Sequence, residues 1–206
     1  RVRTPPSVSK TGGITSGLYR SSHAGATWQL PGVSQGIPAP AATTGRISIA
    51  VAQSNPNVVY SIFKTTTGNN ISGIYKSTNK GLNWATMSMA GVQSSGFDWY
   101  FGLIEVDPTN PNTVYIGSVD IFRTTNGSNW VNLTNSYSGS FEQQHPDQHV
   151  LWINPANPNN LINGNDGGIF KTGTGNAPCT KSYDLPISQF YASNIDHLNP
   201  LRKIGG

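Results

Sequence analysis

The sequence contains a single cysteine, Cys179, and few charged residues. One cysteine cannot form a disulfide within the chain, and it cannot supply a cysteine-based metal cluster. Charged residues make up 11% of the chain, and 13 basic against 9 acidic side chains give a formal net charge of +4. Because nucleic-acid binding needs Lys and Arg clustered on one face, and no such cluster is found, we expect no nucleic-acid partner.

Long apolar runs and helical patterns are also missing. No segment is apolar for long enough to be a signal peptide or a membrane span, and none has the periodicity of an amphipathic helix. Gly, Asn, Ser and Thr are abundant instead, which is typical of short strands joined by tight turns. We therefore predict one all-β domain without a membrane span, in a chain that is a mature protein or a fragment.

Two phrases recur along the chain in a fixed order. GLYRSSHAGATW from Gly17 returns as GIYKSTNKGLNW from Gly73, as DIFRTTNGSNW from Asp120, and in part as GIFKTGTG from Gly168. An Asn-Pro-Asn triplet, at residues 55, 110 and 157, precedes each of the last three copies, and a fainter echo closes the chain. Recurrence in the same order indicates one supersecondary unit that is repeated.

Each repeat reads as four strands. In the first complete repeat, the alternating and apolar segments lie at residues 47–51, 58–63, 74–77 and 84–87. Four strands in roughly 45 to 55 residues are typical of a propeller blade. The repeats predict a β-propeller of four-stranded antiparallel blades, with Trp28, Trp84 and Trp130 in equivalent places near the start of the outermost strands.

The blade count predicts an incomplete ring. Three full blades are expected around residues 47–89, 101–134 and 149–185, partial blades at 17–30 and 190–206, and an N-terminal tail at 1–16. A closed propeller usually has about four to eight blades. We therefore expect the remaining blades to come from a longer chain or from another subunit.

The turn phrase is similar to the Asp-box of the sialidase-like repeat families, Ser-x-Asp-x-Gly-x-Thr-Trp. Ser77, Asn79, Gly81 and Trp84 fall on that pattern. The chain from Gly17 onward resembles the propellers of sortilin-type luminal domains, of xyloglucanase-like glycoside hydrolases and of secreted bacterial proteins with a type IX sorting domain. The stretch HPDQHVLWINPANPNNLINGNDGGIFKT, followed by ISQFY, resembles the last group most.

The resemblance implies a secreted or cell-surface protein, and the low charge with many Asn, Ser and Thr residues agrees with this. It implies no single activity, because the relatives include enzymes, receptors and proteins of no known function. No copy keeps the aspartate of the box, whose position is taken by His23, Asn79 and Asn126 in turn. Because Asn caps such a turn by accepting a bond from a nearby backbone N–H, we interpret the box as scaffold.

His145, Asp147 and His149 form the most suggestive polar cluster. In an extended segment their side chains would share one face, where two imidazoles and a carboxylate could hold a divalent metal. Pro146 interrupts such a strand, and a His-Asp pair commonly serves only to satisfy polar groups. We favour hydrogen bonding without a metal, at the rim of the propeller channel close to Asp166.

Asp166 lies in an Asn-Asp-Gly-Gly stretch that resembles the region in which xyloglucanase-like enzymes carry a catalytic carboxylate. Glycoside hydrolysis needs a second carboxylate about 5 to 10 Å away. Asp98, Glu105 and Glu142 are candidates without a matching motif. The glycines fit equally well a tight turn that opens a strand.

An aromatic patch precedes the fifth expected strand, at Phe97, Trp99, Tyr100 and Phe101. Aromatic faces stack on sugar rings, although alternation would bury half of these side chains between blades. Core packing is therefore the preferred role for the patch. Trp99 and Tyr100 are its candidate binding residues.

Two functions from different classes remain open. The first is a non-catalytic module that binds a glycan or a protein, as in adhesion, through His145, Asp147, His149, Trp99 and Tyr100. The second is a glycoside hydrolase, with Asp166 as a catalytic residue and this chain supplying part of the cleft. The module is preferred, and the sequence points to no metal and no cofactor.

Overall fold

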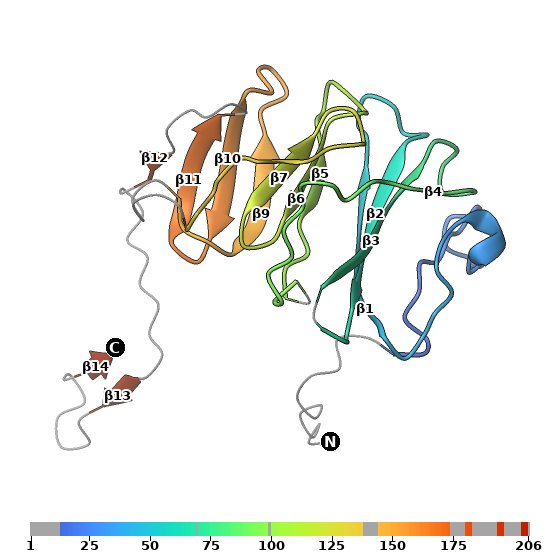
Figure 1. Ribbon diagram of the computed structural model, residues 1–206, viewed down its shortest axis with the longest axis horizontal. Helices are drawn as coiled ribbons and strands as arrows, with labels where there is room; N and C mark the ends of the chain where they lie inside the picture. Colours follow the sequence, from blue (N-terminus) through green and yellow to red (C-terminus); the bar gives the residue numbers. More distant parts are fainter. Residues whose placement is uncertain are drawn as a thin grey trace.

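The computed structural model describes residues 13–68, 70–98, 100–137, 144–173, 180–182, 193–195 and 203–205. These residues form strands and turns, and their one helical element is a single 3-10 turn, η1 (Val33–Gln35). Three four-stranded antiparallel sheets dominate the structure (Figure 1). Within the described ranges, no helix is long and apolar enough to cross a membrane. The prediction of an all-β fold is confirmed.

Each sheet is a simple meander, so strands adjacent in sequence are also adjacent in the sheet. Blade 1 contains β1 (Thr44–Val51), β2 (Val59–Thr65), β3 (Ile71–Ser77) and β4 (Ala85–Thr86). Blade 2 contains β5 (Ile104–Val106), β6 (Val114–Gly117), β7 (Ile121–Thr124) and β8 (Val131–Asn132). Blade 3 contains β9 (Gln148–Ile153), β10 (Asn160–Asn165), β11 (Gly168–Gly173) and β12 (Thr180–Lys181). A separate pair consists of β13 (Ser193–Ile195) and β14 (Lys203–Gly205).

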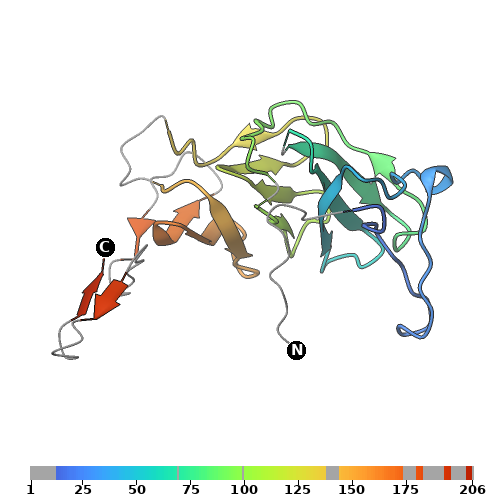
Figure 2. The same cartoon turned by 90° about the horizontal axis from the view of Figure 1, so that it is seen from below.

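The blades follow one another in chain order, with blade 2 in the middle (Figure 2). All four residues of β6 are buried because a neighbouring blade covers each face of that sheet. Val114 and Ile116 pack into the core shared with blade 1, whereas Tyr115 packs into the core shared with blade 3. Fully burying an aliphatic or aromatic side chain contributes about 1.5 to 3 kcal/mol, so these two cores hold the stack together.

The Asn-Pro-Asn turns connect the first and second strand of every blade in the same way. The first Asn side chain accepts a bond from the backbone N–H two residues on, at 3.2 Å in blade 1, 3.0 Å in blade 2 and 3.2 Å in blade 3. Its backbone carbonyl also accepts from the third residue on, as from Val58 to Asn55 at 2.9 Å. The repeated phrase is therefore a repeated turn.

In blades 1 and 2, the turns between the third and fourth strands are capped by Asn, as the sequence predicts. Asn79 Oδ1 accepts from the Asn83 N–H at 2.9 Å, and Asn126 Oδ1 accepts from the N–H groups of Ser128 at 2.9 Å and Asn129 at 3.1 Å. The aspartate of the family pattern is not needed for this bond, because the amide oxygen of Asn accepts equally well.

The three tryptophans occupy equivalent positions, each immediately before the fourth strand or, for Trp28, before the Arg20–Gln29 bridge. The backbone N–H of Trp84 donates to Gln35 at 2.7 Å, and that of Trp130 donates to Ala90 at 2.8 Å. Each bond joins a blade to the preceding unit. Trp84 and Trp130 are 8% and 4% exposed.

Trp28 differs from these two in burial, because its side chain is 63% exposed. No earlier described unit lies against it, since the described residues begin at Gly13. The blades thus form an open arc, which agrees with the predicted incomplete propeller (Figure 1).

Candidate polar site at the non-repeated end of the blades

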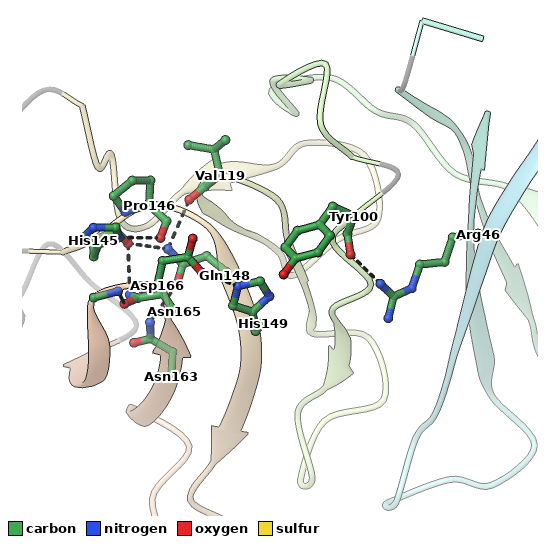
Figure 3. Close-up of polar contacts among 11 residues, drawn as sticks. Arg46, Tyr100, Val119, His145, Pro146, Gln148, His149, Asn163, Asn165 and Asp166 are labelled. Atoms are coloured by element: carbon green, nitrogen blue, oxygen red, sulfur yellow. Dashed lines mark hydrogen bonds and ion pairs between the residues drawn. The ribbon is translucent and has the colours of Figure 1, made fainter. Parts of the chain in front are cut away.

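The candidate residues meet at the end of the sheets opposite the Asn-Pro-Asn turns. Three segments form this end: the loop before β5, the segment before β9 and the β10–β11 turn. Figure 3 shows their side chains side by side, from Arg46 on β1 across Tyr100 to His149 and Asp166. The three blades therefore contribute to one surface.

The β10–β11 turn presents Asp166 at its tip. Asn165 Oδ1 accepts from the Gly167 N–H at 3.0 Å, and Gly168 has φ 119°, a conformation that favours glycine. A Cβ atom on Gly167 would lie 2.4 Å from His145 Cβ, so only glycine leaves room for His145. The two glycines fit the tight turn predicted as the alternative for this stretch.

His149 and Asp166 form the pair that the strand order predicts. His149 Nε2 lies 2.7 Å from Asp166 Oδ1, and the two side chains are 35% and 42% exposed. His149 lies on β9 and Asp166 follows the neighbouring β10, because Gln148 and Asn165 are register partners. The predicted contact between these residues is confirmed.

Residues 145–149 do not form one extended strand, as the interruption expected at Pro146 indicates. Asp147 has φ 69°, and β9 begins only at Gln148, so the three side chains do not alternate along one strand. Proline at 146 has no N–H for a strand ladder. The N–H of Asp147 donates instead to Val119 of blade 2 at 3.0 Å.

Asp147 nevertheless shares the electrostatic environment of its neighbours. Burial and the nearby Asp166 carboxylate raise the pKa of Asp147, while His145 and His149 lower it in part. The two carboxylates therefore lie in different environments, since Asp147 is half-buried and Asp166 pairs with the His149 imidazole.

Buried amides support this surface from below. Gln148 Oε1 accepts from Asn163 Nδ2 at 2.8 Å and from Gln144 Nε2 at 3.1 Å, and Gln148 Nε2 donates to the His145 carbonyl at 2.7 Å. Gln148 and Asn163 are fully buried. Such a network fixes the segment before β9, and thereby the backbone of His145 (Figure 3).

Tyr100 is held beside His149 by an anchored loop. Its ring meets the His149 ring edge to face, with centroids 5.4 Å apart and an interplanar angle of 88°. Asp98 is fully buried and accepts bonds from Ser94, Ser95 and Ser118. The guanidinium of Arg46 donates to the Tyr100 carbonyl.

Lys64 completes the anchor with an amine that donates to the carbonyl of Phe101. This lysine is 1% exposed. Burial lowers its pKa to about 8; the Asp98 carboxylate opposes the shift and the Arg46 charge adds to it. Sequence reasoning missed Lys64 and the anchoring bond of Arg46, because neither residue belongs to a repeated phrase.

The residues of the aromatic patch and the candidate second carboxylates lie in different environments. Phe101 is 2% exposed, as core packing predicts, whereas Phe97 and Tyr100 are 62% and 52% exposed because they lie in a loop without strand alternation. Trp99 and Glu142 lie outside the described residues. Asp98 is committed to its loop and does not face Asp166 as a second carboxylate. Glu105 lies toward the opposite end of the blades.

The surface contains no obvious metal centre in the part of the chain that is described. There, no group of three or more His, Cys, Asp or Glu side chains is arranged to hold a metal ion. His149 and Asp166 instead satisfy each other. The roles of the candidate residues in binding or catalysis stay predictions.

Comparison with solved structures defines the fold. A GH74 enzyme from Niastella koreensis matches 93% of this chain with a TM-score of 0.63 and 18% identity. The fold is that of a β-propeller. The GH74 xyloglucanase from Xanthomonas campestris matches 81% of the chain (TM-score 0.53, 17% identity), and an ancestral GH74 enzyme matches 83% (TM-score 0.55, 19% identity).

The propeller chain spans only 29%, 26% and 22% of these three proteins. Their likeness at this level of identity establishes the fold and leaves the activity open. No family model matches the sequence, and no curated protein is significantly similar to it.

Chemically, the surface offers donors, acceptors and one ring face within a small area. Histidine nitrogens and carboxylate oxygens can exchange hydrogen bonds with hydroxyl groups, and an exposed tyrosine ring can cover an apolar sugar face.

Proposed function

We propose that this surface binds a glycan without cleaving it, in a secreted or cell-surface propeller protein of the Asp-box group. The observation that carries the proposal is the exposed His149–Asp166 pair directly beside the exposed ring of Tyr100. His145 and Asp147 extend the polar area. Sugars present hydroxyl groups and an apolar ring face together, which this combination of side chains matches.

Binding without hydrolysis is favoured because glycoside hydrolysis needs a second carboxylate. Two of the candidates for that role, Asp98 and Glu105, do not face Asp166. The bond from His149, at 2.7 Å, is to Oδ1 of Asp166, and a carboxylate accepts more than one bond, so the pair can also meet a sugar hydroxyl. Glycoside hydrolases with this fold act on carbohydrates, which supports a carbohydrate ligand here. Hydrolysis is not proposed for this surface.

Affinity electrophoresis of the full chain in gels containing xyloglucan tests the proposal. Retardation is expected for the wild type, and Tyr100→Ala and His149→Ala should each weaken it at least about tenfold, or about 1.4 kcal/mol. Tyr19→Ala and His23→Ala are matched controls, because both residues are exposed and lie before blade 1. Equal retardation of all four variants would contradict the assignment of the site. If xyloglucan does not retard the wild type and only a protein ligand binds to this surface, the ligand is a protein and the glycan proposal is wrong.

A glycoside hydrolase is the second candidate, favoured by the proximity of Asp147 and Asp166. The raised pKa of Asp147 suits a general acid, and Asp166 would supply the second carboxylate. Release of reducing ends from xyloglucan, abolished by Asp147→Asn and by Asp166→Asn, would establish this activity. Binding with no release of reducing ends would support the non-catalytic proposal.

A further inference from the structure

A groove lies between blades 2 and 3 on the side of the Asn-Pro-Asn turns, away from Asp166. Its volume is about 350 Å³. One charged side chain, Glu105, and one amide side chain, Gln53, line it. The remaining lining residues are apolar or proline: Val106, Pro108, Leu151, Trp152, Ile153 and Pro155.

Glu105 reaches this groove because of the alternation along β5. Its neighbours Ile104 and Val106 are buried in the core shared with blade 1. The side chain of Glu105 therefore points to the other face, toward blade 3. Its register partner is Tyr115, which packs in the core shared with blade 3.

Among the residues that the structure describes, no cation pairs with the Glu105 carboxylate. Burial alone raises its pKa, with no contribution from a neighbouring charge. Among the described residues, the only ion pair is that of His149 with Asp166. The side chain of Glu105 is exposed, so its carboxylate can be reached by a cationic ligand.

The wall contributed by β9 adds hydrogen-bonding groups. β9 is the edge strand of blade 3, paired with β10 on one side only. Backbone groups on the other edge, at Leu151–Ile153, are therefore available beside the groove. Together with the amide oxygen of Gln53, they can accept the protons of an ammonium group that Glu105 does not take.

We propose that this groove binds the side chain of a lysine, presented by a peptide or protein partner. The aliphatic stem would lie along Pro108 and Pro155, and the ammonium group would face Glu105. The ammonium group of a lysine would pair with the exposed carboxylate of Glu105, and its methylene groups match the apolar residues that line the groove. Because the chain has a net charge of +4, its overall field does not attract a cation. The attraction at this groove would come from Glu105 itself.

Nuclear magnetic resonance titration of the labelled full chain with Nα-acetyl-lysine methylamide tests this proposal. Saturable shifts are expected at Gln53 and at the backbone of Leu151–Ile153. The neutral analogue Nα-acetyl-norleucine methylamide, which has the same length of aliphatic chain, should bind at least about tenfold more weakly. Equal binding of the two compounds, or no saturable shift with the lysine compound, would overturn the proposal.

Glu105→Gln should weaken binding of the lysine compound at least about tenfold, because the substitution removes the charge and keeps the shape. Asp166→Asn is the matched control and should leave it unchanged, since Asp166 lies at the other end of the blades. Loss in both variants would indicate general electrostatics and overturn the site. Wild-type affinity should also fall toward pH 4 as Glu105 is protonated, which tests the site without a substitution. None of these outcomes depends on glycan binding at the opposite end of the blades, so the two proposals can fail separately.

Discussion

The two ends of the blades differ in how much they repeat. At one end, the Asn-Pro-Asn turns have the same hydrogen bonds in successive blades, and the turns between the third and fourth strands of blades 1 and 2 are both capped by Asn. At the other end, each blade contributes something different: Arg46 and Lys64 from blade 1, Tyr100 from blade 2, and the pair of His149 with Asp166 from blade 3. Repetition therefore marks the scaffold, and departure from it marks the candidate site.

The difference has a physical origin. A turn that joins two strands within a blade must form the same bonds in every copy of the blade, so its residues are constrained in every copy. Loops at the opposite end need only to be anchored. Asp98 and Lys64 supply that anchor once, for one loop.

Substitution of the repeated tryptophans should have the largest effect on stability. Trp130→Ala removes a side chain that is 4% exposed and should lower the free energy of unfolding by about 3 to 5 kcal/mol. Trp28→Ala removes the equivalent side chain at 63% exposure and should change it by no more than about 0.5 kcal/mol. Chemical denaturation measures both.

Trp28→Ala is thus an internal control for the same residue type at the same repeat position. Equal losses from the two substitutions would contradict the view that contact with the preceding unit, and not the turn itself, stabilises these residues.

The sequence predicts the repeated end much better than the other. The phrases ending in Trp84 and Trp130 are sufficient to predict the turns and the strands beside them, because turn chemistry is local. The contact between His149 and Asp166 was also predictable, since hairpin order places these residues at one end of adjacent strands. The left-handed backbone of Asp147 was not, because it depends on a bond to Val119 in another blade.

The buried Lys64 shows the same limit. Nothing in its local sequence indicates burial, since a lysine at the end of a strand is ordinarily exposed. Its position follows from packing against the loop before β5, which is a contact between blades.

The pH dependence of stability should report the Lys64 anchor, with an intermediate effect. The folded-state pKa is about 8, below the ordinary value of 10.5, so the folded chain binds this proton less tightly than the unfolded chain. The burial penalty is complete below pH 8 and is lost as the pH rises toward 10.5. The contribution of Lys64 should therefore make the free energy of unfolding rise between pH 8 and about 9.5, by at most on the order of 1 kcal/mol per pH unit.

Lys64→Met should remove this slope, whereas Lys171→Met, at an exposed position on β11, should retain it. The range stops near pH 9.5 because burial raises the pKa values of Tyr60, Tyr75 and Tyr115, whose ionisation destabilises the fold at higher pH. A slope that survives in Lys64→Met would show that another group titrates there.

The smallest effect on stability is expected from the His149–Asp166 pair, because both side chains are partly exposed and solvent screens their attraction. A double-mutant cycle with His149→Ala and Asp166→Asn should give a coupling energy of about 0.2 to 1 kcal/mol, and high salt should reduce it. His23→Ala paired with Asp166→Asn should give no coupling, since His23 lies in the turn before Trp28.

Elemental analysis of the purified wild type and of His149→Ala decides between a hydrogen-bonded pair and a metal site. A bound metal that is lost in His149→Ala would contradict the hydrogen-bonded interpretation, because the imidazole would then serve as a ligand. Measurable coupling without any metal would establish that His149 and Asp166 stabilise each other directly, at the end of the blades where the repeat gives way to individual residues.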